Sequence, residues 1–204
     1  MEMLKLLVAG GASAAVLAMA EGGLLQALIG GVAYTGPLSA MIAIERELGL
    51  IASSTRRLAA LTVAVTEDAK RVATRLRLSN AETKALDSMG HRWWRLATKD
   101  DANARRLLYR LGPERYHDRV LLGWARNGGD VTSMRWRALA ELPQRWTAPE
   151  FPLKAADFLA RGLADVADEE DRRGRGRARE RPVVAPGGQA HPGYLDRRVD
   201  ALQR

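Results

Sequence analysis

The stretch Arg75-Leu-Arg-Leu-Ser-Asn-Ala-Glu82 ends one helix and starts the next, and it sets the pattern for the chain around it. Ser79 followed three residues later by Glu82 is a capping box. In this motif Ser79 accepts a hydrogen bond from the Glu82 amide, and the Glu82 carboxylate accepts one from the Ser79 amide. The stretch therefore predicts a helix over 67–75 and a second helix over 81–96.

Similar start and stop signals recur on both sides of this junction. Pro37 opens a helix that runs to Leu48, and Asp100 or Asp101 opens one over 102–111 that stops at Gly112-Pro113. Further helices are expected at 13–20, 24–29, 55–65, 114–126, 130–142 and 153–161. No run with alternating polarity indicates a strand. The predicted fold is an all-α array of about ten short helices joined by short linkers.

The composition changes beyond residue 163. The acidic cluster Asp168-Glu-Glu-Asp171 precedes an Arg-Gly tract over 172–181, and a stretch rich in Pro and Gly follows. Such a segment cannot bury a core. We therefore expect a folded domain over 1–163, a disordered linker over 164–193 and a short helix over 194–204. An Arg-Gly tract can bind RNA loosely, but a solvated linker is the favoured interpretation.

The charge of the chain points to polyanionic partners. The 204 residues include 32 Lys and Arg against 24 Asp and Glu, a formal net charge of +8. From residue 164 onward nine Arg face eight acidic residues, so the front part keeps 23 basic and 16 acidic residues. The excess therefore belongs to the folded region and favours nucleic acid first and an anionic membrane surface second. Arg-rich helices with solvated faces are the simpler alternative.

Double-stranded RNA is recognised through phosphates, 2′-hydroxyls and shape, so arginines on helix faces and amides at helix starts are the expected contacts. Three clusters fit this description, although i,i+4 pairing on a solvated face would explain each of them as well. The candidate RNA-binding residues are Arg75, Arg77, Ser79 and Asn80; Arg105, Arg106 and Arg110; and Arg115, Arg119 and Arg126.

Residues with catalytic potential do not form a recognisable constellation. The histidines His91, His117 and His191 lie far apart without metal-ligand spacing, and the chain has no Cys. Gly10-Gly-Ala-Ser13 resembles a phosphate loop, but no Lys-Ser/Thr pair and no Asp-x-Asp pair follow it. We therefore expect no catalytic residue, no metal site and no cofactor in this chain.

The tryptophans divide into two kinds. Trp124 and Trp136 lie among apolar residues and are expected to anchor the core. Trp93 and Trp94 are adjacent and cannot face the same way, so one of the pair should be more exposed.

The capping-box junction and four further segments resemble one known family. These segments are Leu4-Lys-Leu-Leu7, Met19-Ala-Glu-Gly-Gly-Leu-Leu25, Leu107-Leu-Tyr-Arg-Leu-Gly112 and Phe151-Pro-Leu-Lys-Ala-Ala-Asp-Phe-Leu159. In this order and spacing they resemble the helical C-terminal half of bacterial CCA-adding tRNA nucleotidyltransferases of the poly(A) polymerase-like family. The resemblance covers roughly residues 1–163.

The resemblance implies a tRNA-binding role without catalysis. In that family a separate head carries the Gly-Ser loop and the Asp-x-Asp pair that binds Mg²⁺, and a neck reads the incoming nucleotide. Both precede the part matched here, so the implied partners are tRNA and a separately encoded catalytic head, with no membrane and a cytoplasmic location. The chain alone should then add neither CMP nor AMP to tRNA.

Two alternatives remain open. The first is a non-enzymatic helical interaction protein or a degenerate gene remnant. The second is a secreted helical protein, because the apolar run 6–20 ends in Ala18-Met-Ala20, which fits a signal-peptidase site. Against secretion, the first five residues carry no net side-chain charge, and leucines continue at helical spacing beyond Ala20.

Overall fold

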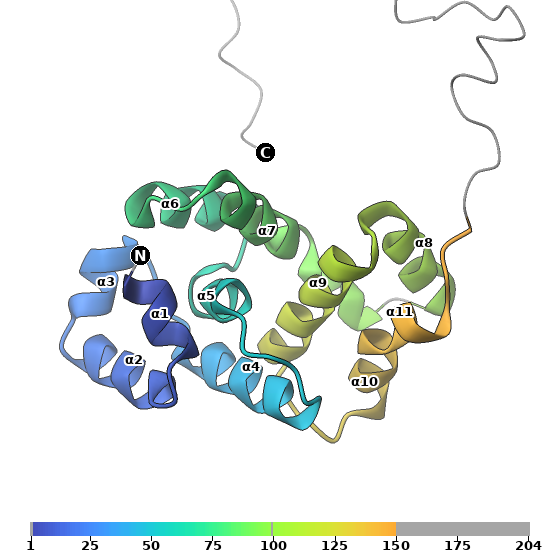
Figure 1. The fold of residues 1–204 in the computed structure, drawn as a ribbon, viewed down its shortest axis with the longest axis horizontal. Helices are drawn as coiled ribbons and strands as arrows, with labels where there is room; N and C mark the ends of the chain where they lie inside the picture. The colour runs from blue at the N-terminus through green and yellow to red at the C-terminus, as the bar shows by residue number, and fades with distance from the viewer. Residues whose placement is uncertain (1, 99, 150–204) are drawn as a thin grey trace, which may run out of the picture. The chain divides into compact units, whose positions relative to one another are not determined.

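The computed structural model describes residues 2–98 and 100–149, and all regular structure in these ranges is helical (Figure 1). The α-helices are α1 Glu2–Val8, α2 Ala12–Glu21, α3 Leu24–Ile29, α4 Thr35–Glu47, α5 Ser54–Thr62, α6 Thr66–Leu76, α7 Asn80–Gly90, α8 Asp101–Leu111, α9 Pro113–Arg126, α10 Met134–Ala140 and α11 Leu142–Arg145. A 3-10 helix, η1, spans Trp93–Thr98. The all-α prediction is confirmed.

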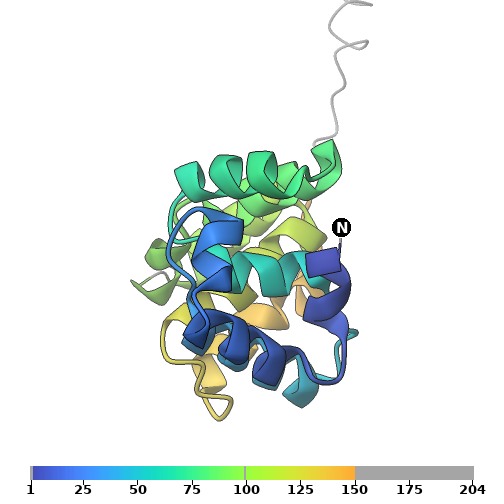
Figure 2. The ribbon, with the colours of Figure 1, turned by 90° about the vertical axis from the view of Figure 1, so that its left-hand side faces the viewer.

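Helix α5 forms the centre of the domain. It packs against α1, α4, α6, α7 and α9, and Figure 1 looks down its axis with these helices around it. Its residues 57–62 are all buried, which only a helix enclosed on most sides can achieve. Helix α9 is the second buried element, with Trp124 fully enclosed. In Figure 2, α6 and α7 lie across one side of the domain while α1, α2 and α3 cover another.

The first two helices belong to this core. Leu7 of α1 and Val16 of α2 are fully buried. In α3, Ile29 is fully buried and Leu25 is 1% exposed. Cleavage after Ala20 would remove Leu7 and Val16 from the core, and with them part of its apolar burial. No helix in the described part of the chain is long and apolar enough to cross a membrane.

The capping box is confirmed. Ser79 accepts from the Glu82 amide at 3.3 Å, and Glu82 Oε2 accepts from the Ser79 amide at 2.7 Å. Asp100 likewise caps α8 by accepting from the Asn103 amide at 2.8 Å.

Three predicted helices were too long, and the one expected over 55–65 ends at Thr62. The helix expected over 81–96 ends at Gly90, where a Cβ would lie 2.8 Å from Val63 Cγ1, so close packing on the α5 end fixes a glycine at this point. Arg92 then takes a left-handed backbone with φ 53°, and the chain continues as η1.

The helix expected over 130–142 starts only at Met134. Asp130 accepts from the amide and the hydroxyl of Thr132, a local turn that competes with helix formation. The tryptophan predictions hold: Trp124 is fully buried, Trp136 is 8% exposed and Trp94 is 46% exposed.

The described residues belong to a compact unit over Met1–Glu150. The helix expected over 153–161, the boundary at 163, the linker 164–193 and the helix 194–204 lie outside the described residues.

Candidate nucleic-acid interface

A groove between α6, α7 and α9 has Lys or Arg side chains at half of its lining positions. It has a volume of about 470 Å³, and Asp87 is the acidic residue among its lining residues. Its polar lining consists of Lys70, Thr83, Lys84, Asp87, Ser88, His91, Arg115 and Arg119. Helix α7, which begins at the capping box, contributes Lys84 and Asp87 to this lining, and α9, which begins at Pro113, contributes Arg115 and Arg119.

Two further grooves continue from the first. The second, of about 360 Å³, shares His91 and Arg119 with it and adds Arg92, Arg95 and Arg110. The third, of about 660 Å³, shares Arg110 with the second and adds Arg105 and Arg106 beside aromatic side chains. The three grooves therefore follow one another along the surface through shared side chains.

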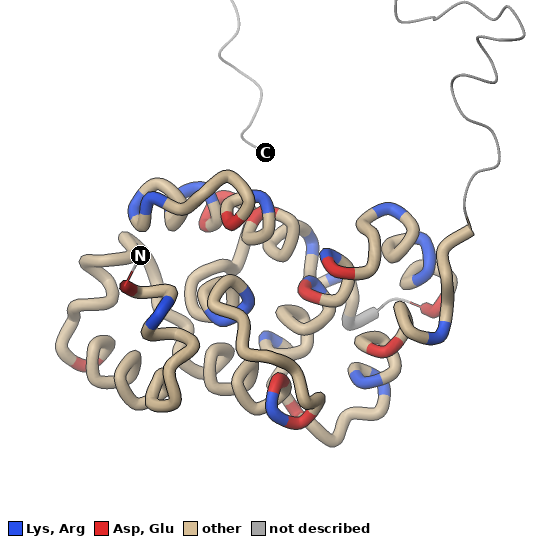
Figure 3. The backbone as a smooth tube through the Cα atoms, viewed as in Figure 1, with Lys and Arg blue, Asp and Glu red and all other residues tan. Residues whose placement is uncertain are grey.

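We call this surface the basic band. Its members are Lys70, Lys84, His91, Arg92, Arg95, Arg105, Arg106, Arg110, Arg115 and Arg119. Figure 3 shows the basic positions along α6, around the end of α7 and the start of α9, and along α8. Among the described residues that line the grooves, nine are permanent cations and Asp87 is acidic, so the lining has a net positive charge.

Arg119 contributes both to the packing of the fold and to the charge of the basic band. It is 5% exposed, and its Nε donates to the Ser88 carbonyl at 2.6 Å. Burial lowers the pKa of its guanidinium to about 10, so it stays charged at neutral pH. Its neighbour Arg115 is exposed. Arg119 therefore ties α9 to the end of α7 and adds charge to the groove floor, while Arg115 offers an accessible contact.

His91 is the titratable group of the band near neutral pH. Burial lowers its pKa below the ordinary 6.5, and the charges of Arg119 and Arg92 lower it further, while Asp87 opposes them. The free protein thus holds His91 mainly neutral at pH 7. Phosphates bound in the grooves would favour its protonated form.

Arg126 lies apart from the band. Its guanidinium carbon stands 4.3 Å over the Tyr34 ring and 5.6 Å from the Trp93 ring, and Nη2 donates to the Ala60 carbonyl at 3.3 Å. Burial lowers its pKa. These contacts connect α9 with α5 and with the chain before α4, so Arg126 stabilises the packing of these elements.

The first predicted cluster lies at the α6–α7 junction. Arg77 is exposed and caps α6 with a left-handed backbone, φ 49°. Arg75 and Arg77 line a separate groove of about 390 Å³ whose other walls include apolar residues of α1. Arg75 also lies against Gly30, where a Cβ would come within 2.7 Å of its Nε. Ser79 and Asn80 are exposed beside them. The structure thus joins the second cluster to Arg115 and Arg119, and leaves Arg75 and Arg77 in another groove.

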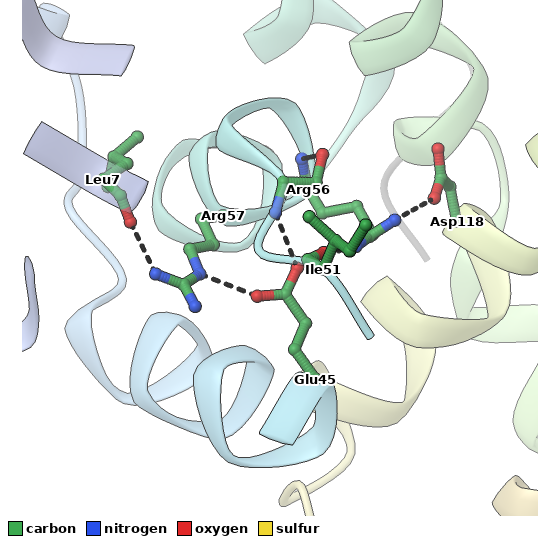
Figure 4. Close-up of polar contacts among 7 residues, drawn as sticks. Leu7, Glu45, Ile51, Arg56, Arg57 and Asp118 are labelled. Atoms are coloured by element: carbon green, nitrogen blue, oxygen red, sulfur yellow. Dashed lines mark hydrogen bonds and ion pairs between the residues drawn. The ribbon is translucent and has the colours of Figure 1, made fainter. Parts of the chain in front are cut away.

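A buried ion-pair network, absent from the sequence predictions, holds α4, α5 and α9 together (Figure 4). Glu45 is 1% exposed; its Oε1 accepts from Arg56 Nε at 2.9 Å and its Oε2 from Arg57 Nε at 2.7 Å. The Ser53 amide donates to Glu45 Oε1 as well, at 3.2 Å. The carboxylate is therefore satisfied on both oxygens, as a buried charge requires.

The two arginines carry the network outward. Arg57 Nη1 donates to the Leu7 carbonyl at 2.8 Å, and Arg56 donates to the Ile51 carbonyl at 2.6 Å. Arg56 Nη1 also pairs with Asp118 at 3.3 Å. Burial raises the pKa of Asp118, and the Arg56 charge opposes this shift. The network thus fixes the start of α9, which bears the band residues Arg115 and Arg119.

Sequence reasoning missed five members of the band: Lys70, Lys84, His91, Arg92 and Arg95. Lys70, Lys84 and Arg95 come from α6, α7 and η1, and His91 and Arg92 from the turn between α7 and η1. Only the folding of these segments near α9 brings them together. The exposed positions of Lys70 and Lys84, on the polar sides of their helices, were the available signal. No group of three or more potential metal ligands gathers within residues 2–98 and 100–149.

Comparison with known proteins gives one relative. Over 109 residues the chain is 39% identical to an uncharacterized 28 kDa protein in the petA 5′ region of Rhodospirillum rubrum. The match covers 50% of this chain and 42% of that protein, so the chain spans less than half of the relative's length. No family model matches the chain, and no solved structure matches it.

Proposed function

We propose that this chain binds tRNA in the cytoplasm, as the tRNA-binding helical portion of a CCA-adding nucleotidyltransferase. The observation that carries the proposal is the basic band. Its three grooves are connected through the shared residues His91, Arg119 and Arg110, and among their described lining residues Asp87 is the acidic one. A phosphate backbone is the ligand that such a surface favours, because each neutralised phosphate releases a counterion.

The proposed mechanism is binding and positioning. The grooves follow the surface from α6 to α11, so successive phosphates of an RNA arm would meet successive cations. Arg119 and the Glu45 network hold α7 and α9 in fixed positions, so the cations are arranged before RNA arrives. Helices that already stand in place need no backbone rearrangement on binding, which favours affinity. The catalytic head, with its Mg²⁺, would act on the tRNA end that this portion holds in place.

The test is tRNA binding at low salt by fluorescence anisotropy. Replacing Arg110 and Arg115 by Gln should weaken binding by about tenfold or more, because both are exposed band cations. A control that replaces Lys5 and Arg46 by Gln makes the same charge change at exposed sites off the band and should bind like the wild type. Equal weakening by both variants, or no binding by the wild type, would contradict the proposal.

A helical interaction protein is the second candidate, supported by apolar side chains exposed on α1, α2, α3 and the segment after α3. They are Val8 at 41%, Leu17 at 50%, Leu24 at 62%, Leu28 at 39% and Val32 at 59%. Scattered exposed leucines are ordinary, but several on adjacent elements indicate a contact surface. Sedimentation of the wild type and of Leu24→Ser tests it: self-association that Leu24→Ser removes, without tRNA binding, would favour this function.

A further inference from the structure

The third groove of the basic band differs from the other two in carrying aromatic side chains. Arg105, Arg106, Tyr109 and Arg110 of α8 line one wall, and Trp146 and Pro149 line the other. Its volume of about 660 Å³ falls within the ~300–1,000 Å³ typical of small-molecule sites. A groove of this size accommodates one nucleotide.

The arginines of this groove are unpaired with the rest of the described chain. Arg105, Arg106 and Arg110 are exposed and have no ion pair or hydrogen bond to another described side chain. No acidic residue within the described range 100–149 lines the groove. Three unneutralised guanidiniums around one hollow favour an anionic ligand, and a planar guanidinium binds phosphate through two hydrogen bonds.

The aromatic rings give the groove a second chemistry. Tyr109 is 50% exposed although α8 buries Ala104 and Leu108 on its other face, so the ring is available to a ligand. Trp146 is half-buried at the end of α11 and faces the same groove. In a nucleotide, a flat aromatic base lies next to a phosphate. In this groove, aromatic rings lie next to guanidiniums, so the site and a nucleotide are chemically complementary. Bases inside a duplex are covered on both faces by their neighbours, so only an unpaired base can stack on a side chain.

We infer that this groove takes an unpaired nucleotide of the bound RNA, with its base against the exposed Tyr109 ring and its flanking phosphates on Arg105, Arg106 and Arg110. The inference rests on the proposed RNA binding and adds a site that distinguishes unpaired from paired RNA. The rest of the basic band meets duplex phosphates alone.

The experiment compares two RNA hairpins, one blunt and one with a short unpaired overhang, by anisotropy. Stacking of one base corresponds to roughly a 5- to 150-fold gain in affinity, so the wild type should bind the overhang hairpin tighter by a factor in that range. Tyr109→Ala should lose this preference and keep the blunt-hairpin affinity, whereas Tyr109→Phe should keep both. Arg115→Gln, outside the groove, should weaken both hairpins equally.

A second readout does not depend on any variant. A 2-aminopurine placed in the overhang should lose fluorescence on binding to the wild-type chain, because stacking quenches it. Equal affinity for the two hairpins, absence of quenching, or a preference that survives in folded Tyr109→Ala would overturn the groove inference alone. Free AMP that binds as tightly as the overhang hairpin would make this a free-nucleotide site and also overturn it. Failure to bind either hairpin would instead overturn the proposed function.

Discussion

Replacing Glu45 by Gln removes the charge that Arg56 and Arg57 share inside the domain. The Glu45 side chain is 1% exposed and the Arg57 side chain 10%, so the substitution leaves a guanidinium in a site with little water. Leaving one member of a buried pair uncompensated costs about 3–5 kcal/mol, and the amide oxygen of Gln keeps one hydrogen bond, so we expect about 3 kcal/mol. For a domain of this size that lowers the melting temperature by roughly 6–12 °C.

A matched control stands two residues further along α4. Glu47 pairs with Arg137 at 2.7 Å, but its side chain is 48% exposed. An exposed pair contributes less than about 1 kcal/mol, so Glu47→Gln should change the free energy of unfolding little. Urea denaturation followed by circular dichroism measures both variants. Equal stability of Glu45→Gln and the wild type, or equal losses in both variants, would refute the reasoning about burial.

Three further predictions concern the helix junction and the basic band. Ser79→Ala should lower the free energy of unfolding by about 0.5–2 kcal/mol through loss of the cap, and an unchanged urea midpoint would contradict this. Arg77→Gly should raise it by about 1 kcal/mol, because glycine adopts the left-handed backbone without strain; if the junction binds phosphate, the same variant should bind tRNA less tightly. The pKa of His91 is below 6.5 in the free chain, and phosphates would raise it, so protonation accompanies binding and tRNA affinity should increase as pH falls below 6.5. His91→Gln should reduce that dependence, and an identical pH profile in the variant would exclude His91 as its source.

The helices were predictable where their signals are local. Ser79, Asp100 and Pro113 act on residues within one turn, so their effects can be identified without knowing the rest of the fold. The end of α7 at Gly90 depends on contact with Val63, which belongs to another part of the chain. Periodicity therefore predicted that a helix exists there but not where it stops.

The candidate site was predictable only where its residues are neighbours on a single helix. Arg105, Arg106 and Arg110 share the exposed face of one helix, and their spacing gave them as a cluster. Lys70 and Lys84 join them only through packing of α6 and α7 beside α9. Glu45 was overlooked because it follows Ile44 on an apolar helix side, where a single carboxylate next to core residues was the available sign of a buried ion pair.

The salt dependence of tRNA binding tests the central claim most directly. If the basic band neutralises phosphates, the logarithm of the association constant should fall linearly with the logarithm of salt concentration, by about 0.7–0.9 for each phosphate contacted. Arg110→Gln should reduce that slope by about one contact, and the Lys5 and Arg46 control should leave it unchanged. Absence of tRNA binding at low salt, or a slope near zero, would contradict the account.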